Sequence, residues 1–280
     1  MKDSYLKILV TLGLVLLLPG LSLAAWNMDF QEGKTLLAHD IRDLHVIVMI
    51  ISVIIFIGVF GFMFYSIFKH RKSVGHKAAN FHENTTVEII WTVIPFLILA
   101  GMAWPATETL LAMRDTSAPD MTIKATGYQW MWGYEYLDEG IQFYSVMTTP
   151  QTQINGTEEK TENYLLEVDN PVVVPVGKKV RVLTTANDVL HAWYVPALAV
   201  KQDAVPGFIR DTWFKAEETG IFRGQCAELC GKQHGFMPIV VHVVSQEEYE
   251  AWVSEQKAKL SSKAVSPDIK LLANAKADPQ

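Results

Sequence analysis

Two long apolar runs stand in the first half of the chain. His45 to Phe68 is apolar almost throughout, and Ile89 to Met113 is mostly apolar, interrupted by two prolines and one glutamate. Each run exceeds the roughly 20 residues that an α-helix needs to cross the hydrocarbon core of a bilayer. A proline inside such a helix is tolerated by local rearrangement of its backbone bonds. The pattern predicts a transmembrane hairpin with helices over residues 45–68 and 87–113.

Charges on either side of the first helix predict its orientation. The loop 69–86 is basic, with Lys69, Arg71, Lys72 and Lys77 against the single acid Glu83. The preceding segment 26–44 holds the acids Asp29, Glu32, Asp40 and Asp43. Because positively charged loops stay on the cytoplasmic side, we expect the loop in the cytoplasm and both flanking segments outside. In a Gram-negative bacterium the outside of the inner membrane is the periplasm.

Residues 1–25 have the organisation of a cleaved secretory signal. Lys2 and Lys7 precede the apolar run Ile8 to Leu18, and small residues follow it. A basic start, a short apolar core and a small-residue end are typical of such signals, which predicts a mature chain beginning near Trp26. The alternative interpretation is a third membrane anchor.

The pattern changes over residues 119–245 to short runs of β-branched and aromatic residues separated by turn signals such as Asn155-Gly156. Many short strands at this spacing predict an all-β sandwich or barrel. The runs are Thr122 to Thr126, Trp130 to Leu137, Tyr164 to Val168, Lys179 to Thr185, Ile209 to Lys215 and Pro238 to Val244. Within the last segment, 246–280, Gln246 to Leu260 has helical composition and the remainder resembles a loose tail.

Composition and charge support a membrane protein and exclude one class of partner. Half of the residues are hydrophobic and the mean hydropathy is +0.16, which is too apolar for an ordinary soluble chain. The formal net charge is -6. Phosphate backbones are bound by clustered Lys and Arg, so we expect no nucleic-acid partner.

The segment Gly224 to Pro238 carries the candidate chemistry. It packs Cys226, Cys230, His234 and Met237 into one loop, and these are the only two cysteines of the chain. Soft sulfur ligands combined with imidazole select copper. A second histidine, His191, lies at the end of a strand-like run. The presence of two cysteines favours a pair of metal ions over a single ion.

Two other interpretations of the cysteines are open at this point. A disulfide between Cys226 and Cys230 is plausible in an oxidising compartment, but it gives His234 and Met237 no role. A zinc site would use a closed tetrahedral set and would have no need of Met237. The sequence contains no Cys-x-x-Cys-His segment, so we expect no c-type haem attached to this chain.

The motifs together resemble subunit II of the haem-copper cytochrome c oxidases. The likeness is carried by the segments Gly224 to Pro238, Asp188 to Trp193, Tyr128 to Trp132 and Val87 to Pro95, in that family's order along the chain. The resemblance implies a two-helix transmembrane hairpin followed by an all-β cupredoxin-like sandwich or barrel. It also implies two copper ions in a binuclear CuA centre.

The resemblance assigns a role to each candidate metal ligand. It implies that Cys226 and Cys230 bridge both copper ions and that His191 and His234 bind one ion each. Met237 and the backbone carbonyl of Glu228 would complete the two sites. Two ions that share two thiolates spread one electron over a rigid core, so little moves when an electron arrives or leaves.

Three further roles follow from the resemblance, each beside a plainer alternative. The Glu228 carboxylate is expected to bind magnesium or manganese shared with subunit I, where the alternative is a solvated loop side chain. Trp130 is expected to be the electron entry point, where the alternative is an ordinary packing aromatic. Glu88 is expected at the mouth of a proton path into subunit I, and Thr85 to Glu88 also fits a helix capping box.

The implied function is electron transfer within an oxygen-reducing enzyme whose reaction site lies in another subunit. We expect electrons to come from cytochrome c and to pass through CuA to haem in subunit I, with subunits I and III and the membrane as partners. A quinol oxidase subunit II is one rival, although that family lacks the copper ligands. A membrane-anchored periplasmic copper-binding module is the other, and it would not need Glu88 or Trp130.

Acidic residues in the soluble part are candidates for docking a basic cytochrome c. Asp188 stands first, because it lies three residues before His191, and Asp138 and Glu135 are chosen with it. The alternative is an ordinary solvated surface. The other acids of this group are Glu139, Glu158, Glu159 and Glu162.

Overall fold

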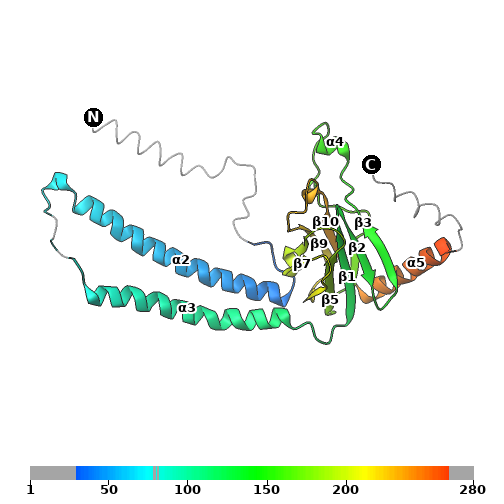
Figure 1. Cartoon of the computed structure of the whole chain (residues 1–280), viewed down its shortest axis with the longest axis horizontal. Coiled ribbons are helices and arrows are strands. Elements are labelled where there is room, and N and C mark those ends of the chain that lie inside the picture. The colour runs from blue at the N-terminus through cyan, green and yellow to red at the C-terminus, as the bar shows by residue number, and fades with distance from the viewer. Residues whose placement is uncertain (1–29, 78–79, 81, 265–280) are drawn as a thin grey trace. The chain divides into compact units, whose positions relative to one another are not determined.

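The computed structural model describes residues 30–264 apart from 78, 79 and 81. The predicted signal segment 1–25 and the tail after residue 264 therefore lie outside the described residues. Within the described part the chain forms two long helices, then ten strands in two sheets, then a terminal helix (Figure 1).

The first long helix, α2 (Leu36–Lys69), begins nine residues before the predicted start. The side chain of Thr35 caps it by accepting a hydrogen bond from the backbone N–H of Ala38, and no glycine or proline interrupts the polar residues that follow. A helix of 34 residues is about 51 Å long at about 1.5 Å per residue, longer than the roughly 30 Å hydrocarbon core. Its polar first turns therefore extend beyond the apolar layer.

The second long helix, α3 (Thr85–Arg114), contains both prolines of the apolar run and corrects one prediction. Its N-cap is Asn84, whose side chain accepts a hydrogen bond from the N–H of Val87. The capping box over Thr85 to Glu88 is therefore wrong, because asparagine one residue earlier takes the capping position. Glu88 lies in the first turn, where the helix dipole favours a negative charge.

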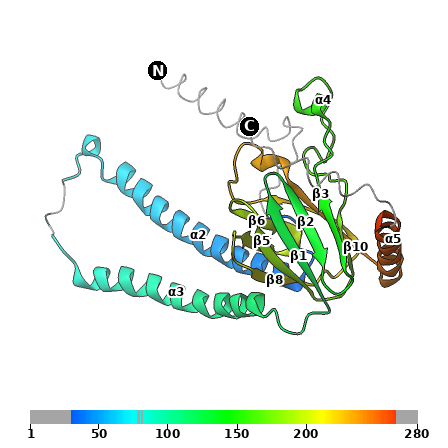
Figure 2. The ribbon, with the colours of Figure 1, turned by 45° about the vertical axis from the view of Figure 1, so that its right-hand side comes forward.

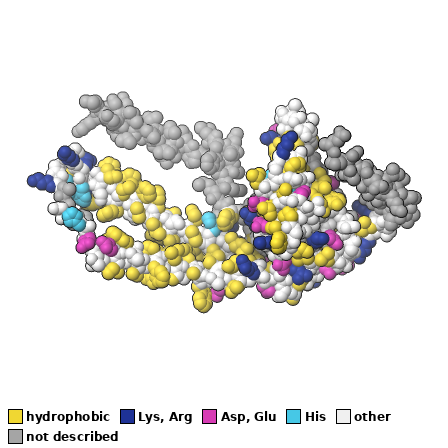
Figure 3. Space-filling view, in the orientation of Figure 1, with side chains coloured by type: hydrophobic (Ala, Val, Ile, Leu, Met, Phe, Trp, Pro, Cys, Tyr) yellow, Lys and Arg dark blue, Asp and Glu magenta, His cyan; other side chains and the backbone are white. Residues whose placement is uncertain are grey.

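The side chains of the hairpin suit a lipid environment. Both helices are long and apolar enough to cross a membrane, and their apolar windows are not buried within the described protein. Figure 3 shows hydrophobic side chains along both helices and Lys, Arg and His side chains gathered at the loop between them. The loop contains one 3-10 turn, η2 (Lys72–Val74). Two spans agree with the predicted hairpin.

The soluble part is a sandwich of two five-stranded sheets with the orders β3-β2-β1-β5-β8 and β4-β10-β9-β6-β7 (Figures 1 and 2). The first sheet contains β1 (Met121–Tyr128), β2 (Met131–Tyr136), β3 (Ile141–Ser145), β5 (Val180–Ala186) and β8 (Arg210–Phe214). The second contains β4 (Val172–Pro175), β6 (His191–Val195), β7 (Val200–Ala204), β9 (Gly220–Cys226) and β10 (Pro238–Val244). The predicted all-β sandwich is confirmed.

The core lies between the two sheets and follows from alternation along the strands. In β5 every second residue is buried, and in β10 the inward positions Ile239, Val241 and Val243 are almost fully buried. Large aromatic side chains, above all Trp132 and Trp193, fill the space between the layers. Most pairings are antiparallel, but β1 pairs with β5 and β4 pairs with β10 in parallel.

Two local predictions fail. Residues 164–168 do not form a strand, and only Val168 makes an isolated bridge, to Met147. They belong to an arm, residues 146–171, that connects β3 to β4 and includes the short helix α4 (Gln151–Ile154). His191 begins strand β6 and does not end a strand, because the preceding residues Asn187 to Val189 form a bend.

The last helix, α5 (Gln246–Ala264), begins directly after β10 and confirms the predicted helical segment. Trp252 packs against the aromatic residues Tyr136 and Phe143 of the first sheet, and Tyr249 stacks on Trp252. Lys257 forms an ion pair with Glu139 in the β2–β3 turn. The helix therefore covers the end of the sandwich at which both β2 and β10 end.

Candidate metal centre

The loop from β9 to β10 carries most of the candidate ligands. Cys226 is the last residue of β9, and Met237 directly precedes β10. The two strands pair from Gln225 opposite Pro238 onward, which fixes both ends of the loop. A short 3-10 turn, η4 (His234–Phe236), presents His234 between them. We call this end of the sandwich the copper-loop end.

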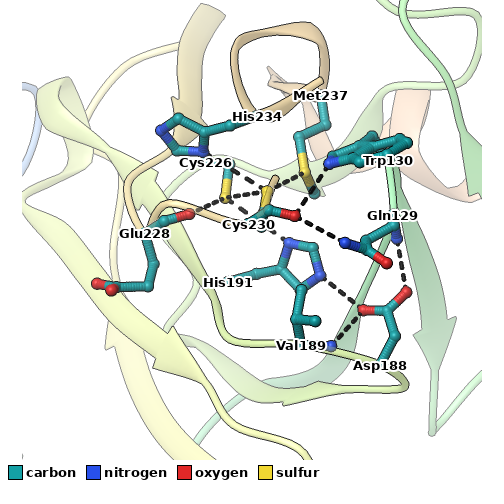
Figure 4. A network of polar contacts seen from close by, with 10 residues as sticks. All are labelled: Gln129, Trp130, Asp188, Val189, His191, Cys226, Glu228, Cys230, His234 and Met237. Atoms are coloured by element: carbon teal, nitrogen blue, oxygen red, sulfur yellow. Dashed lines mark hydrogen bonds and ion pairs between the residues drawn. The ribbon is translucent and has the colours of Figure 1, made fainter. Parts of the chain in front are cut away.

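Strand β6 brings the remaining histidine to the same place. Trp193 of β6 lies opposite Cys226 of β9, so His191, two residues earlier, reaches the start of the loop. Its Nδ1 atom lies 3.8 Å from the Cys226 sulfur, and the imidazole is fully buried. The Nδ1 atom of His234 lies 3.6 Å from the Cys230 sulfur (Figure 4). Each thiol thus has its own imidazole neighbour.

Two more donors, a thioether sulfur and a backbone carbonyl oxygen, complete the cluster. The sulfur atoms of the two cysteines are 3.9 Å apart. The thioether sulfur of buried Met237 lies 3.6 Å from the Cys230 sulfur, and the carbonyl oxygen of Glu228 lies 3.3 Å from the Cys226 sulfur. The structure therefore brings together all six residues that the sequence nominated as metal ligands.

The spacing of the two sulfurs distinguishes between the interpretations left open above. A disulfide requires about 2.05 Å between its sulfurs, and both cysteines are free at 3.9 Å. A first-row metal ion lies about 2.3 Å from a thiolate sulfur, so both sulfurs can bond to the same ion. Met237 gives the donor set a third sulfur, which suits copper and has no place in a closed tetrahedral zinc site.

Electrostatics make the two thiols unequal in the metal-free protein. Burial alone raises the pKa of Cys226, but contacts with His191 and nearby backbone groups outweigh it and lower this pKa to about 7. Burial and the negative charge of Cys226 raise the pKa of Cys230 to about 12. One thiolate forms readily, and the second needs the positive charge of a metal ion, so binding releases a proton.

Asp188 holds the His191 ring. Its Oδ1 atom lies 2.9 Å from Nε2 of the imidazole, and its Oδ2 atom accepts a hydrogen bond from the Gln129 N–H at 2.7 Å. Burial alone would raise the pKa of this carboxyl, but the hydrogen bonds lower it overall. A carboxylate acceptor keeps the proton on Nε2 and leaves Nδ1, the atom that faces Cys226, free for a metal.

The expected electron-entry residue is in direct contact with this centre. The indole N–H of partly buried Trp130 donates a hydrogen bond of 3.1 Å to the carbonyl oxygen of Cys230. The side-chain amide of Gln129 donates to the same oxygen at 2.9 Å. Sequence reasoning missed Gln129, whose position inside a family motif was its only signal. It placed Asp188 close to the site from its spacing to His191, but as a docking acid and not as the partner of a candidate ligand.

The other predicted residues lie apart from the sulfur cluster. The Glu228 side chain is exposed, and its carboxylate points away from the two cysteines in Figure 4. Glu88 lies at the start of α3, the opposite end of that helix from the chain leading into β1. Asp138 follows the far end of β2 and caps the N–H of Thr122, and Glu135 pairs with Lys124. The structure does not bring Asp138 to Trp130.

The acids of the arm, by contrast, rise from the copper-loop end. Ser145, where the arm begins, lies opposite Trp132, two residues from Trp130. Glu158, Glu159 and Glu162 are all exposed on this arm. Arg223 of β9 fastens the base of the arm through Glu167, with Nε and Oε1 3.0 Å apart.

The two apolar helices, the sandwich and the loop of soft donors define a class of protein, namely a membrane-anchored copper protein with a cupredoxin-like soluble part. Two family descriptions match the chain: "Cytochrome C oxidase subunit II, transmembrane domain" over residues 24–109 and "Cytochrome C oxidase subunit II, periplasmic domain" over residues 121–244. The chain belongs to the cytochrome c oxidase subunit II family, and the resemblance read from its motifs is confirmed.

Individual relatives agree. The chain is 39% identical to cytochrome c oxidase subunit 2 of Cereibacter sphaeroides over 241 residues, which cover 81% of this chain and 80% of the relative. It is 42% identical to cytochrome c oxidase subunit 2 of Metridium senile over 233 residues, 81% of this chain and 89% of the relative. It also matches the crystal structure of the periplasmic domain of subunit II of Bradyrhizobium japonicum cytochrome oxidase. That match has 48% identity and a TM-score of 0.47 and covers 51% of this chain and 98% of that chain. The chain is thus a subunit of a haem-copper oxidase, a respiratory oxidoreductase.

Proposed function

We propose that this chain accepts electrons from cytochrome c at a binuclear CuA centre and passes them to haem in subunit I. There oxygen is reduced to water and protons are translocated. The observation that carries the proposal is the pair of buried thiols 3.9 Å apart, each with its own imidazole at 3.6 to 3.8 Å. This arrangement supplies two sets of donors, each with one imidazole, around two sulfurs that both sets would share.

The protein contributes rigidity and a low-polarity surrounding to this centre. A shared pair of copper ions supplies one-electron chemistry in which the charge is spread over both ions. Cys226 and Cys230 would bridge the ions, His191 and His234 would bind one each, and Met237 and the Glu228 carbonyl would be the weaker donors. Cys226, Cys230, His191 and Met237 are all at least 94% buried within a packed sandwich, which limits movement when the charge changes.

The electron route proposed here begins at Trp130. Its ring is partly exposed at the copper-loop end, and its N–H bonds to the backbone of the ligand Cys230. One aromatic side chain therefore spans the distance from the surface to the centre. The plainer interpretation, a packing aromatic, accounts for the burial of the ring but not for a hydrogen bond that ends on a ligand.

Assembly with subunits I and III is also part of the proposal. Exposed apolar side chains stand on loops at the copper-loop end: Leu229 is 78% exposed, Phe208 66% and Ile209 65%. Apolar side chains grouped in this way mark protein contacts. Glu228, with its carboxylate directed outward, would share magnesium or manganese with subunit I. Glu88 at the start of α3 would admit protons to the path in that subunit.

The proposed location is the bacterial inner membrane, with the sandwich in the periplasm. The basic loop between α2 and α3 supports a cytoplasmic hairpin loop. A signal over residues 1–25, cleaved before Trp26, would place the N-terminal segment on the same side as the sandwich.

Copper stoichiometry tests the proposal. The full-length chain, purified in detergent and loaded with copper, is expected to bind two ions per chain and to give the purple colour and electron paramagnetic resonance (EPR) spectrum of a delocalised mixed-valence pair. Metal analysis and EPR measure both properties on one sample. One ion per chain, or a spectrum of a single localised Cu(II), would refute the binuclear assignment.

Docking of cytochrome c is expected to depend on the arm. Replacing Glu158, Glu159 and Glu162 together with glutamine should raise the apparent KM for cytochrome c by up to about tenfold at low salt, since complementary charge mainly speeds encounter. The maximal rate should stay nearly constant, and the salt dependence should flatten. Steady-state oxidation of cytochrome c by the assembled oxidase at several ionic strengths measures these effects.

A matched control uses three exposed acids of α5, at the opposite end of the sandwich. Changing Glu247, Glu250 and Glu255 to glutamine alters the net charge by the same amount. These changes should leave KM and its salt dependence nearly unaltered. If both triple variants behave alike, the arm is not the docking surface.

A further inference from the structure

Gly127 stands in a strand where nothing in the backbone requires glycine. It is the last but one residue of β1, paired with Trp132 of β2 and Ala186 of β5. Its φ lies outside the left-handed region that favours glycine. Glycine inside a strand weakens it and often marks a close approach by another group. The reason for this glycine must therefore lie in what faces it.

The group that faces Gly127 is the imidazole of His191. A Cβ atom built at Gly127 would lie 2.7 Å from Cδ2, 2.8 Å from Cγ and 2.9 Å from Cβ of His191. All three distances are shorter than real Cβ contacts, and they involve the base of the side chain as well as its ring. The space that a side chain would fill at Gly127 is occupied by the proposed copper ligand.

The ring has no free direction in which to yield. His191 is fully buried. Asp188 holds Nε2 at 2.9 Å, and the ring of Trp132 meets the imidazole edge to face with centroids 6.0 Å apart. Moving the ring away from a methyl group at position 127 would break the Asp188 contact or displace Nδ1 from the Cys226 sulfur.

We propose that Gly127 is a positioning residue for the copper centre. Its missing side chain leaves the space, or seat, that the Cβ, Cγ and Cδ2 atoms of His191 occupy, and the Asp188 carboxylate holds Nε2, the ring atom bonded to Cδ2. The seat is built in the metal-free protein, so His191 is preorganised, whereas the other imidazole, His234, is only partly buried on the β9–β10 loop. This inference rests on the proposed CuA function.

The first test compares two glycine-to-alanine variants that add the same methyl group. Gly127→Ala meets His191, while Gly235→Ala, next to His234 in the loop, meets nothing within 4 Å. In the full-length detergent-solubilised chain, Gly127→Ala should lower the apparent copper affinity at least about tenfold, the loss that accompanies about 1.4 kcal/mol of binding free energy. It should also alter the EPR hyperfine pattern and the midpoint potential. Gly235→Ala should match the wild type in all three.

The outcomes separate the inference from the function on which it rests. If the wild type binds two ions and Gly127→Ala equals it in affinity, spectrum and potential, the seat is refuted and the CuA assignment stands. A wild type that binds no copper pair refutes the CuA assignment itself.

A second test needs no metal and still applies if Gly127→Ala folds poorly. His191→Gly removes all three atoms that the added methyl would strike. In a double-mutant cycle on the metal-free chain, Gly127→Ala should lower the melting temperature clearly in the His191 background and far less in the His191→Gly background. An equal decrease in both backgrounds would mean that the methyl conflicts with some other group, and the proposed seat would be wrong.

Discussion

Replacing Trp130 with alanine is expected to slow the reduction of the copper centre by cytochrome c at least about tenfold, equivalent to about 1.4 kcal/mol of barrier. The substitution removes the ring that reaches the surface together with the indole N–H that bonds to the carbonyl oxygen of Cys230 at 3.1 Å. Affinity for cytochrome c should change little, because long-range attraction comes from charged groups. Stopped-flow reduction of the assembled oxidase, followed at the absorption of the centre, measures the rate.

Two companion variants identify which part of Trp130 matters. Trp130→Phe keeps an aromatic ring and loses the N–H, so an intermediate rate would show that the hydrogen bond to Cys230 is part of the route. Trp213→Ala is the matched control, because Trp213 of β8 is also partly buried and its indole donates to a backbone carbonyl, that of Ala112, at 3.1 Å. Normal electron entry in Trp130→Ala, or an equal loss in Trp213→Ala, would place the entry point elsewhere.

The large elements could be predicted because their signals are local. Apolar length alone identified both membrane helices, and β10 was predicted with the bounds that the structure has. The start of α2 was missed because the polar residues before His45 read as a segment outside the membrane. A helix capped at Thr35 continues through them without needing lipid.

The candidate ligands of the site could be predicted from the sequence, but the residues that contact and position those ligands could not. Cysteine, histidine and methionine are residue types that bind metals, so the motif that contains them predicted their clustering in the structure. Gly127 and Gln129 carry no such signal, since their importance arises from contacts with residues more than 60 positions away along the chain. Only the packing of β1, in the first sheet, against the second sheet, in which β6 pairs with β9, places them against these residues.

The acids proposed for docking could be recognised by type, but the sequence did not show where on the sandwich they lie. Asp138 and Glu158 both read as surface carboxylates in the sequence. The structure places Asp138 beyond the far end of β2, and it places the arm of Glu158 at the copper-loop end. Asp188 turns inward and contacts His191, so its carboxylate supports a candidate ligand. Docking residues depend on which loops share an end of the sandwich, and composition does not contain that information.

The candidate copper ligands differ in strength and should respond differently to substitution. Met237→Leu is expected to retain both copper ions and to shift the midpoint potential of the centre. Leucine has nearly the volume of methionine, so the buried position should tolerate it at a cost of less than about 1.5 kcal/mol. The change removes a thioether sulfur that lies 3.6 Å from the Cys230 sulfur, and weak axial ligands of this kind tune the potential of copper sites. Met121 is a buried methionine of β1, and Met121→Leu is therefore the matched control, which should leave the potential unaltered.

Cys226→Ser, in contrast, is expected to destroy the pair of copper ions. A hydroxyl has little affinity for copper, and the change removes one of the two sulfurs that both ions would share, together with the thiol whose pKa is lowered to about 7 beside His191. Cys230 cannot replace it, because the chain has only these two cysteines and one thiolate cannot supply both of the sulfurs that the two ions would share. Metal analysis of the purified full-length variant should find fewer than two ions per chain, and EPR should show a localised Cu(II) or no signal. A delocalised pair that persists in Cys226→Ser would contradict the bridging role of the thiolates. A potential in Met237→Leu that equals that of Met121→Leu would remove Met237 from the ligand set.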